Sequence, residues 1–224
     1  MIQVQKATPL PQPNLQPKAL RVLANIVSYI CHPVFMPIVM AYVVYRLMPA
    51  EFTGLTAKQI GLLFINIGYT TTFFPLFSIF LMRQLNFISS YHMPQARERT
   101  GPLMATMIFY FWVSHVFNSM PGVVPFALKV LLLGNLWGII LLFMANIFTK
   151  VSMHTAAAGG MVGIIIVLMI ISPANMAAPL LIALILAGII GTARMILGAH
   201  QRGDIWLGYI IGIIVQLGAY IYMK

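Results

Sequence analysis

Long apolar runs separated by short polar intervals make up most of this chain. The runs cover residues 22–47, 60–82, 103–118, 126–148, 156–171, 177–197 and 205–223. A helix rises about 1.5 Å per residue, so runs of this length suit a crossing of about 30 Å of membrane hydrocarbon. The pattern predicts an all-α, polytopic transmembrane helical bundle with about six or seven spans. Gly159, Gly160 and Gly163 in the fifth run predict close packing against another helix.

Prolines mark the irregular parts of this pattern. In the first run His32 is followed by Pro33 and by a second proline one turn later, so we expect a kink there, with His32 in an interhelical hydrogen bond. Pro102 is expected in the first turn of the third helix. Residues 1–18 carry four prolines among polar residues and predict a disordered tail without a signal peptide, which leaves residues 19–224 as a single transmembrane domain.

The composition indicates a membrane protein and limits the kinds of partner that its charge can bind. Apolar residues make up 61% and charged residues 7%, and the mean hydropathy is +0.94, values that exclude an ordinary soluble domain. The net charge of +10 comes from 13 basic and 3 acidic residues. Nucleic-acid binding needs a basic face in water, which so apolar a chain does not offer, so the charge indicates lipid headgroups or a phosphorylated substrate.

Three polar intervals contain the side chains best suited to catalysis or ligand binding. They cover residues 83–101, 149–155 and 194–204, and two apolar runs separate each from the next. If every run is a full crossing, all three intervals lie on one membrane face. The turns on the opposite face, residues 119–125 and 172–178, carry no charge. We therefore expect the side chains of the three intervals to form one site.

Together these intervals contain the residue types needed for metal-free phosphoryl transfer. Guanidinium groups match the geometry of phosphate oxygens and neutralise their charge. Of two histidines, one can attack phosphorus while the other protonates the leaving oxygen. A carboxylate one helical turn after a histidine can hold the imidazole in one tautomer. The residues concerned are Arg97, Arg99, Lys150, Ser152, His154, Arg194, His200, Arg202 and Asp204.

Other chemistries fit this set less well. The chain has 3 carboxylates, too few for the cage of a two-metal hydrolase. A zinc ion at His154, His200 and Asp204 would be repelled by the nearby cations, and Ser152 lacks the G-x-S-x-G context of a serine hydrolase. We therefore expect neither a metal nor a cofactor. The plain alternative is that the intervals are unconnected charged patches at the membrane surface.

Three short motifs follow one another along residues 97–204. They are Arg97-x-Arg99-x2-Pro102, Val151-Ser152-Met153-His154 and Ala193-Arg194-x5-His200-x3-Asp204. In type and order they resemble the motifs of the type-2 phosphatidic acid phosphatases, membrane lipid-phosphate phosphatases related to vanadium haloperoxidases. The third motif has alanine in place of serine, and the second lacks its proline and glycine. The first lacks a lysine seven residues before either arginine, and Lys150, the second arginine or His92 can replace it.

The resemblance implies a role for each matched residue. His200 would be the nucleophile that forms a phosphohistidine, Asp204 would orient it, and His154 would be the general acid. The phosphate would be bound by Arg194, Arg99, Arg97, Ser152 and Lys150.

The resemblance also implies a substrate and a location. The substrate would be a membrane lipid phosphate or pyrophosphate, and the protein would lie in a bacterial inner membrane with its site facing outward. Two alternatives stay open. The phosphoryl group can pass to an alcohol, which makes the protein a phosphotransferase, or the basic cluster can bind phosphate without cleaving it, as a transporter does. The headgroup, the chain length and the oligomeric state stay open as well.

Overall fold

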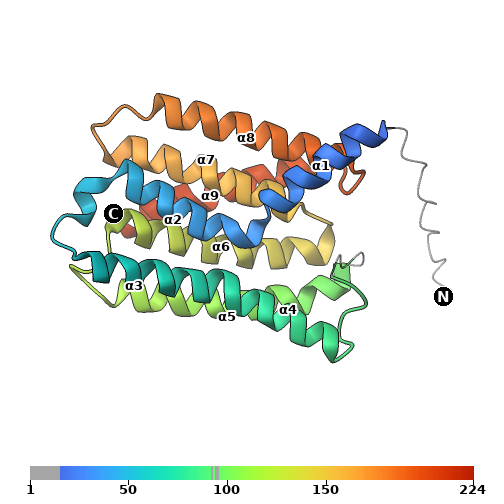
Figure 1. Ribbon diagram of the computed structural model, residues 1–224, viewed down its shortest axis with the longest axis horizontal. Coiled ribbons are helices and arrows are strands. Elements are labelled where there is room, and N and C mark those ends of the chain that lie inside the picture. Colours follow the sequence, from blue (N-terminus) through green and yellow to red (C-terminus); the bar gives the residue numbers. More distant parts are fainter. Residues whose placement is uncertain (1–15, 92, 94–95) are drawn as a thin grey trace.

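A computed structural model of the chain describes residues 16–91, 93 and 96–224, and within these residues every regular element is helical. Residues 1–15 of the expected tail over residues 1–18 and the candidate His92 lie outside this part, whereas the end of that tail, Lys18, already belongs to the first helix. The helices form a bundle of roughly parallel rods (Figure 1). They are α1 (Lys18–Ile30), α2 (Met36–Leu47), α3 (Ala57–Gly68), α4 (Phe74–Gln84), α5 (Ala96–Asn118), α6 (Phe126–Phe148), α7 (Met153–Ile171), α8 (Ala177–Ile196) and α9 (Arg202–Met223). The predicted all-α bundle is confirmed.

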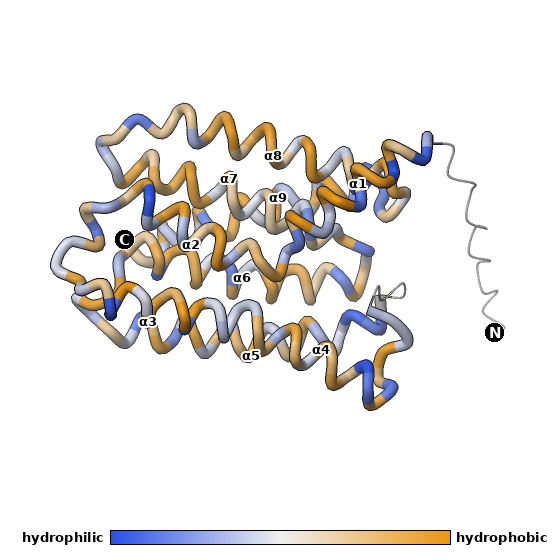
Figure 2. The backbone as a smooth tube through the Cα atoms, in the orientation of Figure 1, coloured by the Kyte–Doolittle hydropathy of each residue, from blue (hydrophilic) through white to orange (hydrophobic). Residues whose placement is uncertain are grey.

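The rods have the length and apolar character of membrane spans. Among the described residues six are long and apolar enough to cross a membrane, with α1 and α2 forming one of them and α3 and α4 another. The helix α5 falls outside this set but lies alongside the other rods (Figure 1). Figure 2 shows the rods mostly in hydrophobic colours, with hydrophilic residues concentrated toward their ends. The chain is therefore an integral membrane protein.

Successive rods run in alternating directions. As a result, the connections α4–α5, α6–α7 and α8–α9 lie at the same end of the bundle, which is also the end where α1 begins (Figure 1). The connections α5–α6 and α7–α8 lie at the opposite end with the C-terminus. The prediction that the three polar intervals share one face is confirmed.

The first rod breaks where the prolines predict. Helix α1 ends at Ile30, a short 3-10 turn spans Pro33–Phe35, and α2 begins at Met36. The Nδ1 atom of His32 accepts a hydrogen bond of 3.3 Å from the backbone N–H of Val34 and so caps this turn. The expected interhelical hydrogen bond of His32 is thus replaced by a local one.

The second rod contains an irregularity that the sequence pattern does not reveal. Between α3 and α4, Tyr69–Phe73 forms a π-helical turn. The hydroxyl of Thr71 donates to the carbonyl of Ile67 at 2.7 Å, which satisfies a polar side chain inside the bundle. Pro75 follows and lacks the N–H that would continue a regular helix across the turn.

Helix α5 begins earlier than expected. It starts at Ala96, so Pro102 lies in the second turn and not in the first. The added turn holds Glu98, whose carboxylate accepts from the N–H of Ser89 at 2.8 Å, and Arg99, whose Nε donates to the carbonyl of Met93 at 3.1 Å. Apolar periodicity ends where the polar turn begins, so it marks the start of the apolar run and not of the helix.

Helices α7 and α9 make the closest packing in the bundle. A side chain at Gly159 would overlap the backbone of Tyr209, and one at Gly163 would press on Ile213. On the facing helix a side chain at Gly212 would overlap the backbone of Ala156 and Gly160. The predicted close approach of this glycine-rich helix is confirmed, and its partner is α9.

This contact gives a first prediction. Replacing Gly212 with alanine forces α7 and α9 apart, because the new methyl group meets backbone atoms that have no rotamer to change. We expect a loss of about 1–3 kcal/mol of stability, seen as a lower Tm in detergent. The matched control is Gly61→Ala in α3, where the added methyl group meets nothing within 4 Å. Equal Tm values for the two variants would contradict the close packing.

Candidate functional site

His200 lies in the connection between α8 and α9. We expected His200 and Asp204 on one face of a helix. Helix α9 begins only at Arg202, so His200 lies before the helix and this expectation is wrong. The turn is made possible by Gly198 at φ +61°, a conformation that favours glycine. The Nδ1 atom of His200 lies 3.0 Å from the carbonyl oxygen of Lys150. Because a carbonyl only accepts, Nδ1 carries the proton and the Nε2 lone pair points away from this bond.

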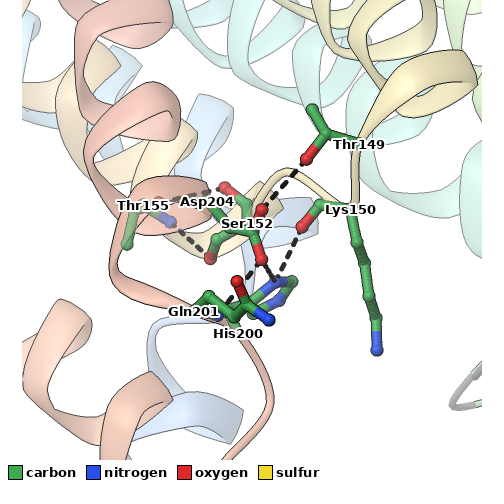
Figure 3. A network of polar contacts seen from close by, with 7 residues as sticks. All are labelled: Thr149, Lys150, Ser152, Thr155, His200, Gln201 and Asp204. Carbon is green, nitrogen blue, oxygen red and sulfur yellow. Dashed lines mark hydrogen bonds and ion pairs between the residues drawn. The ribbon is translucent and has the colours of Figure 1, made fainter. Parts of the chain in front are cut away.

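Asp204 mainly links the α6–α7 connection to the α8–α9 connection, and its contact with the His200 imidazole is weaker. Its carboxylate accepts from the N–H of Gln201 at 3.1 Å and from the hydroxyl of Thr149 at 3.0 Å (Figure 3). The carboxylate oxygen nearest to His200 is 3.9 Å from Nδ1. The close orienting partner of His200 is therefore the Lys150 carbonyl, and Asp204 supplies a negative charge slightly further away.

Ser152 is a helix cap in this structure. It is fully buried, its hydroxyl accepts from the N–H of Thr155 at 3.4 Å, and its own N–H donates to the carbonyl of Asp204 at 3.3 Å (Figure 3). These bonds fix the start of α7 against the start of α9. The expected contact of Ser152 with a phosphate oxygen stays a prediction, and in this conformation the hydroxyl faces the helix end.

His154 lies in the first turn of α7 and faces α1. Its Nε2 atom lies 3.1 Å from the carbonyl oxygen of Ser28, so Nε2 is the donor in this bond. Its ring meets the ring of His32 edge-on, with 5.5 Å between the centroids. The hydroxyl of Ser28 in turn accepts from Nη1 of Arg194 at 3.2 Å. Sequence reasoning missed Ser28 and His32 as neighbours of the site.

Two guanidinium groups complete the cluster. Arg194 is in the last turn of α8, and Arg99, which is 7% exposed, is in the first turn of α5. Both act electrostatically on His200, and Arg194 also acts on His154. Nη1 of Arg99 and Nε of Arg194 are buried without a hydrogen-bond partner. Buried N–H donors on cations attract an anion with several acceptor oxygens.

The remaining predicted phosphate ligands lie at the edge of this cluster. The side chain of Arg97 is exposed on α5. The side chain of Lys150 is also exposed and extends away from the network (Figure 3). Lys150 contributes its carbonyl to His200 directly, whereas its ammonium group acts on the site only as a nearby charge. Arg194 and Arg99 are therefore the two cations that the fold brings to the histidines.

The electrostatics keep His200 neutral. Burial is the largest cause, and together with Arg194, Arg99 and Lys150 it lowers the pKa of His200 to about 4, against the opposing effect of the Lys150 carbonyl bond. Burial and Arg99 also lower the pKa of the Lys150 ammonium group. The His200 side chain is 4% exposed. A neutral imidazole shielded from water has an available lone pair at pH 7, as a nucleophile requires.

The part of the chain that the structure describes contains no group of three or more His, Cys, Asp or Glu side chains placed to hold a metal ion. In particular, His154 does not join His200 and Asp204 in such a group.

Comparisons with known proteins add no relative. No protein-family model, no curated protein and no solved structure matches this chain. The site therefore stands on its own geometry and on the motif spacing.

Proposed function

We propose that this protein is an integral membrane enzyme that hydrolyses a phosphate or pyrophosphate ester of a lipid through a phosphohistidine at His200. One observation carries the proposal. The Nδ1 proton of His200 is held by a backbone carbonyl, its Nε2 lone pair is not engaged by that bond, and the guanidinium groups of Arg99 and Arg194, each with one buried nitrogen lacking a hydrogen-bond partner, act on it electrostatically. This combination places a neutral nucleophile next to donors suited to phosphate oxygens.

The chemistry follows from these positions. Arg99 and Arg194 bind the non-bridging oxygens of the phosphoryl group. Nε2 of His200 attacks phosphorus, and the bond to the leaving oxygen breaks while His154 gives that oxygen a proton. Water then attacks the phosphohistidine and gives a proton back to His154. The P–N bond breaks, phosphate leaves, and His200 returns to its neutral form.

A lateral groove supports a lipid as the substrate. A cavity of about 590 Å³ lies along α7, α8 and α9. Small residues such as Gly188 and Gly191 line it within the spanning part, and Trp206 and Arg202 line it near the site end. Because its lining is mostly apolar and belongs to membrane-spanning helices, the groove suits a hydrocarbon chain, and Arg202 suits the anionic group that such a chain carries.

Phosphate release from purified protein is the direct test. We expect release from a lipid phosphate or pyrophosphate in mixed micelles, and a loss of about a thousandfold in His200→Ala and about a hundredfold in Arg194→Ala. The matched control is His115→Ala, which removes an exposed histidine from α5 outside the site and should keep wild-type activity. Trapping of labelled phosphate on an added alcohol would indicate a phosphotransferase instead.

A protein that binds these lipids and releases no phosphate would contradict the enzyme and favour a phosphate-binding membrane protein.

The groove gives its own prediction. A Cβ atom added at Gly188, which lines the groove, meets no protein atom within 4 Å, so the side chain of Gly188→Phe starts in open space and is expected to occupy the groove. We expect kcat/KM to fall about tenfold or more for a long-chain lipid phosphate and to change little for a short, soluble phosphate ester. Gly61→Phe in α3, where the added atoms also begin in open space, is the control. An equal loss for both substrates would argue against a chain-binding groove.

We further propose a bacterial inner membrane with the site facing outward. The start of α1 lies at the site end of the bundle and the C-terminus at the other (Figure 1). A reporter active only outside the inner membrane should therefore report at an N-terminal fusion and stay silent at a C-terminal one. The reverse pattern would place the site on the inner side.

A further inference from the structure

Helix α1 contacts the site through the buried residue Ser28. Ser28 is 8% exposed and lies in the last turn of α1, where backbone carbonyls are not all used by the helix. Its carbonyl accepts from Nε2 of His154 at 3.1 Å, and its hydroxyl accepts from Nη1 of Arg194 at 3.2 Å. One residue thus contacts a histidine from α7 and an arginine from α8.

His32 lies one turn further along the same segment. Its Nδ1 is engaged by the N–H of Val34, which fixes the ring, and its ring lies edge-on against His154 at 5.5 Å. The helix break before Pro33 therefore produces both contacts. It ends α1 near Ser28, and it turns the His32 ring toward α7.

We propose that Ser28 and His32 are positioning residues for the phosphoryl transfer, holding the general acid His154 and the phosphate-binding Arg194 in place from the N-terminal helix. This inference rests on the proposed function. Ser28 and His32 add a fourth segment of the chain to the site, besides the three segments that contain the motifs.

The two contacts on His154 have a chemical consequence. With Nε2–H directed at the Ser28 carbonyl, Nδ1 is the ring nitrogen left to give a proton to the leaving oxygen. The Ser28 carbonyl also favours the imidazolium that donates this proton, against burial and the charge of Arg194, which both disfavour it. The His32 ring limits rotation of His154 out of this geometry.

The contact on Arg194 acts on substrate binding. The Ser28 hydroxyl accepts a hydrogen bond from Nη1 of the Arg194 guanidinium group, which fixes the direction of its remaining N–H groups. An arginine held in this way loses less conformational freedom when it binds a phosphate oxygen.

Two substrates separate these roles. An alkyl lipid phosphate needs a proton on its leaving oxygen, whereas p-nitrophenyl phosphate has a leaving group that departs as the anion. We expect His32→Ala to lower kcat about tenfold for the alkyl ester and less than twofold for the aryl ester, the pattern that His154→Ala should show more strongly. We expect Ser28→Ala to raise KM about tenfold for both substrates, and Ser28→Thr, which keeps the hydroxyl, to restore it.

The controls are matched by residue type. Ser114→Ala removes a buried serine of α5, and His115→Ala removes a histidine from the same helix; both should behave as wild type. Wild-type kinetics in Ser28→Ala and His32→Ala would overturn the inference while leaving an active enzyme. The inference would also be overturned if His32→Ala lowered kcat equally for both substrates and His32→Gln did not restore it. An inactive wild-type protein, with His200→Ala indistinguishable from it, would overturn the proposed function and this inference together.

Discussion

The close backbone contact between α7 and α9 is the constraint on which the site depends. His154 lies in the first turn of α7, and His200 lies just before α9, so the distance between the two helix starts sets the spacing of the two imidazoles. Glycines on both helices allow the approach, and the bond from the N–H of Ser152 to the carbonyl of Asp204 fixes its register at the membrane surface. The network around Asp204 then joins the two connections.

Burial sets the charge balance of this site. Burial and the neighbouring cations Arg99 and Arg194 keep His200 neutral. Each of these two arginines also has a buried guanidinium nitrogen without a hydrogen-bond partner. The Asp204 carboxylate already accepts from Thr149 and from the backbone of Gln201. Glu51 caps α6 through the N–H of Ala127 at the other end of the bundle. A phosphoryl group, with negative charge spread over several oxygens, complements such a cluster.

Much of the fold followed from the sequence, because apolar run length and proline positions report directly on membrane crossing. The bundle, the kink at His32–Pro33 and the common face of the polar intervals were predictable in this way. The helix starts at Ala96, Met153 and Arg202 were not, because capping and tertiary contacts set them at the polar surface. Ser28 was missed for a similar reason, since its bond to Arg194 joins residues 166 apart in sequence and carries no local signal.

The position of the phosphoryl group on the enzyme tests this account most directly. Rapid acid-free quenching of the protein with labelled lipid phosphate, followed by peptide mass spectrometry, reads out the modified residue and the ring nitrogen. We expect phosphate on Nε2 of His200, because the Lys150 carbonyl holds the proton of Nδ1. Phosphate on Ser152, on Nδ1 of His200, or on no residue of a protein that turns over substrate would contradict it.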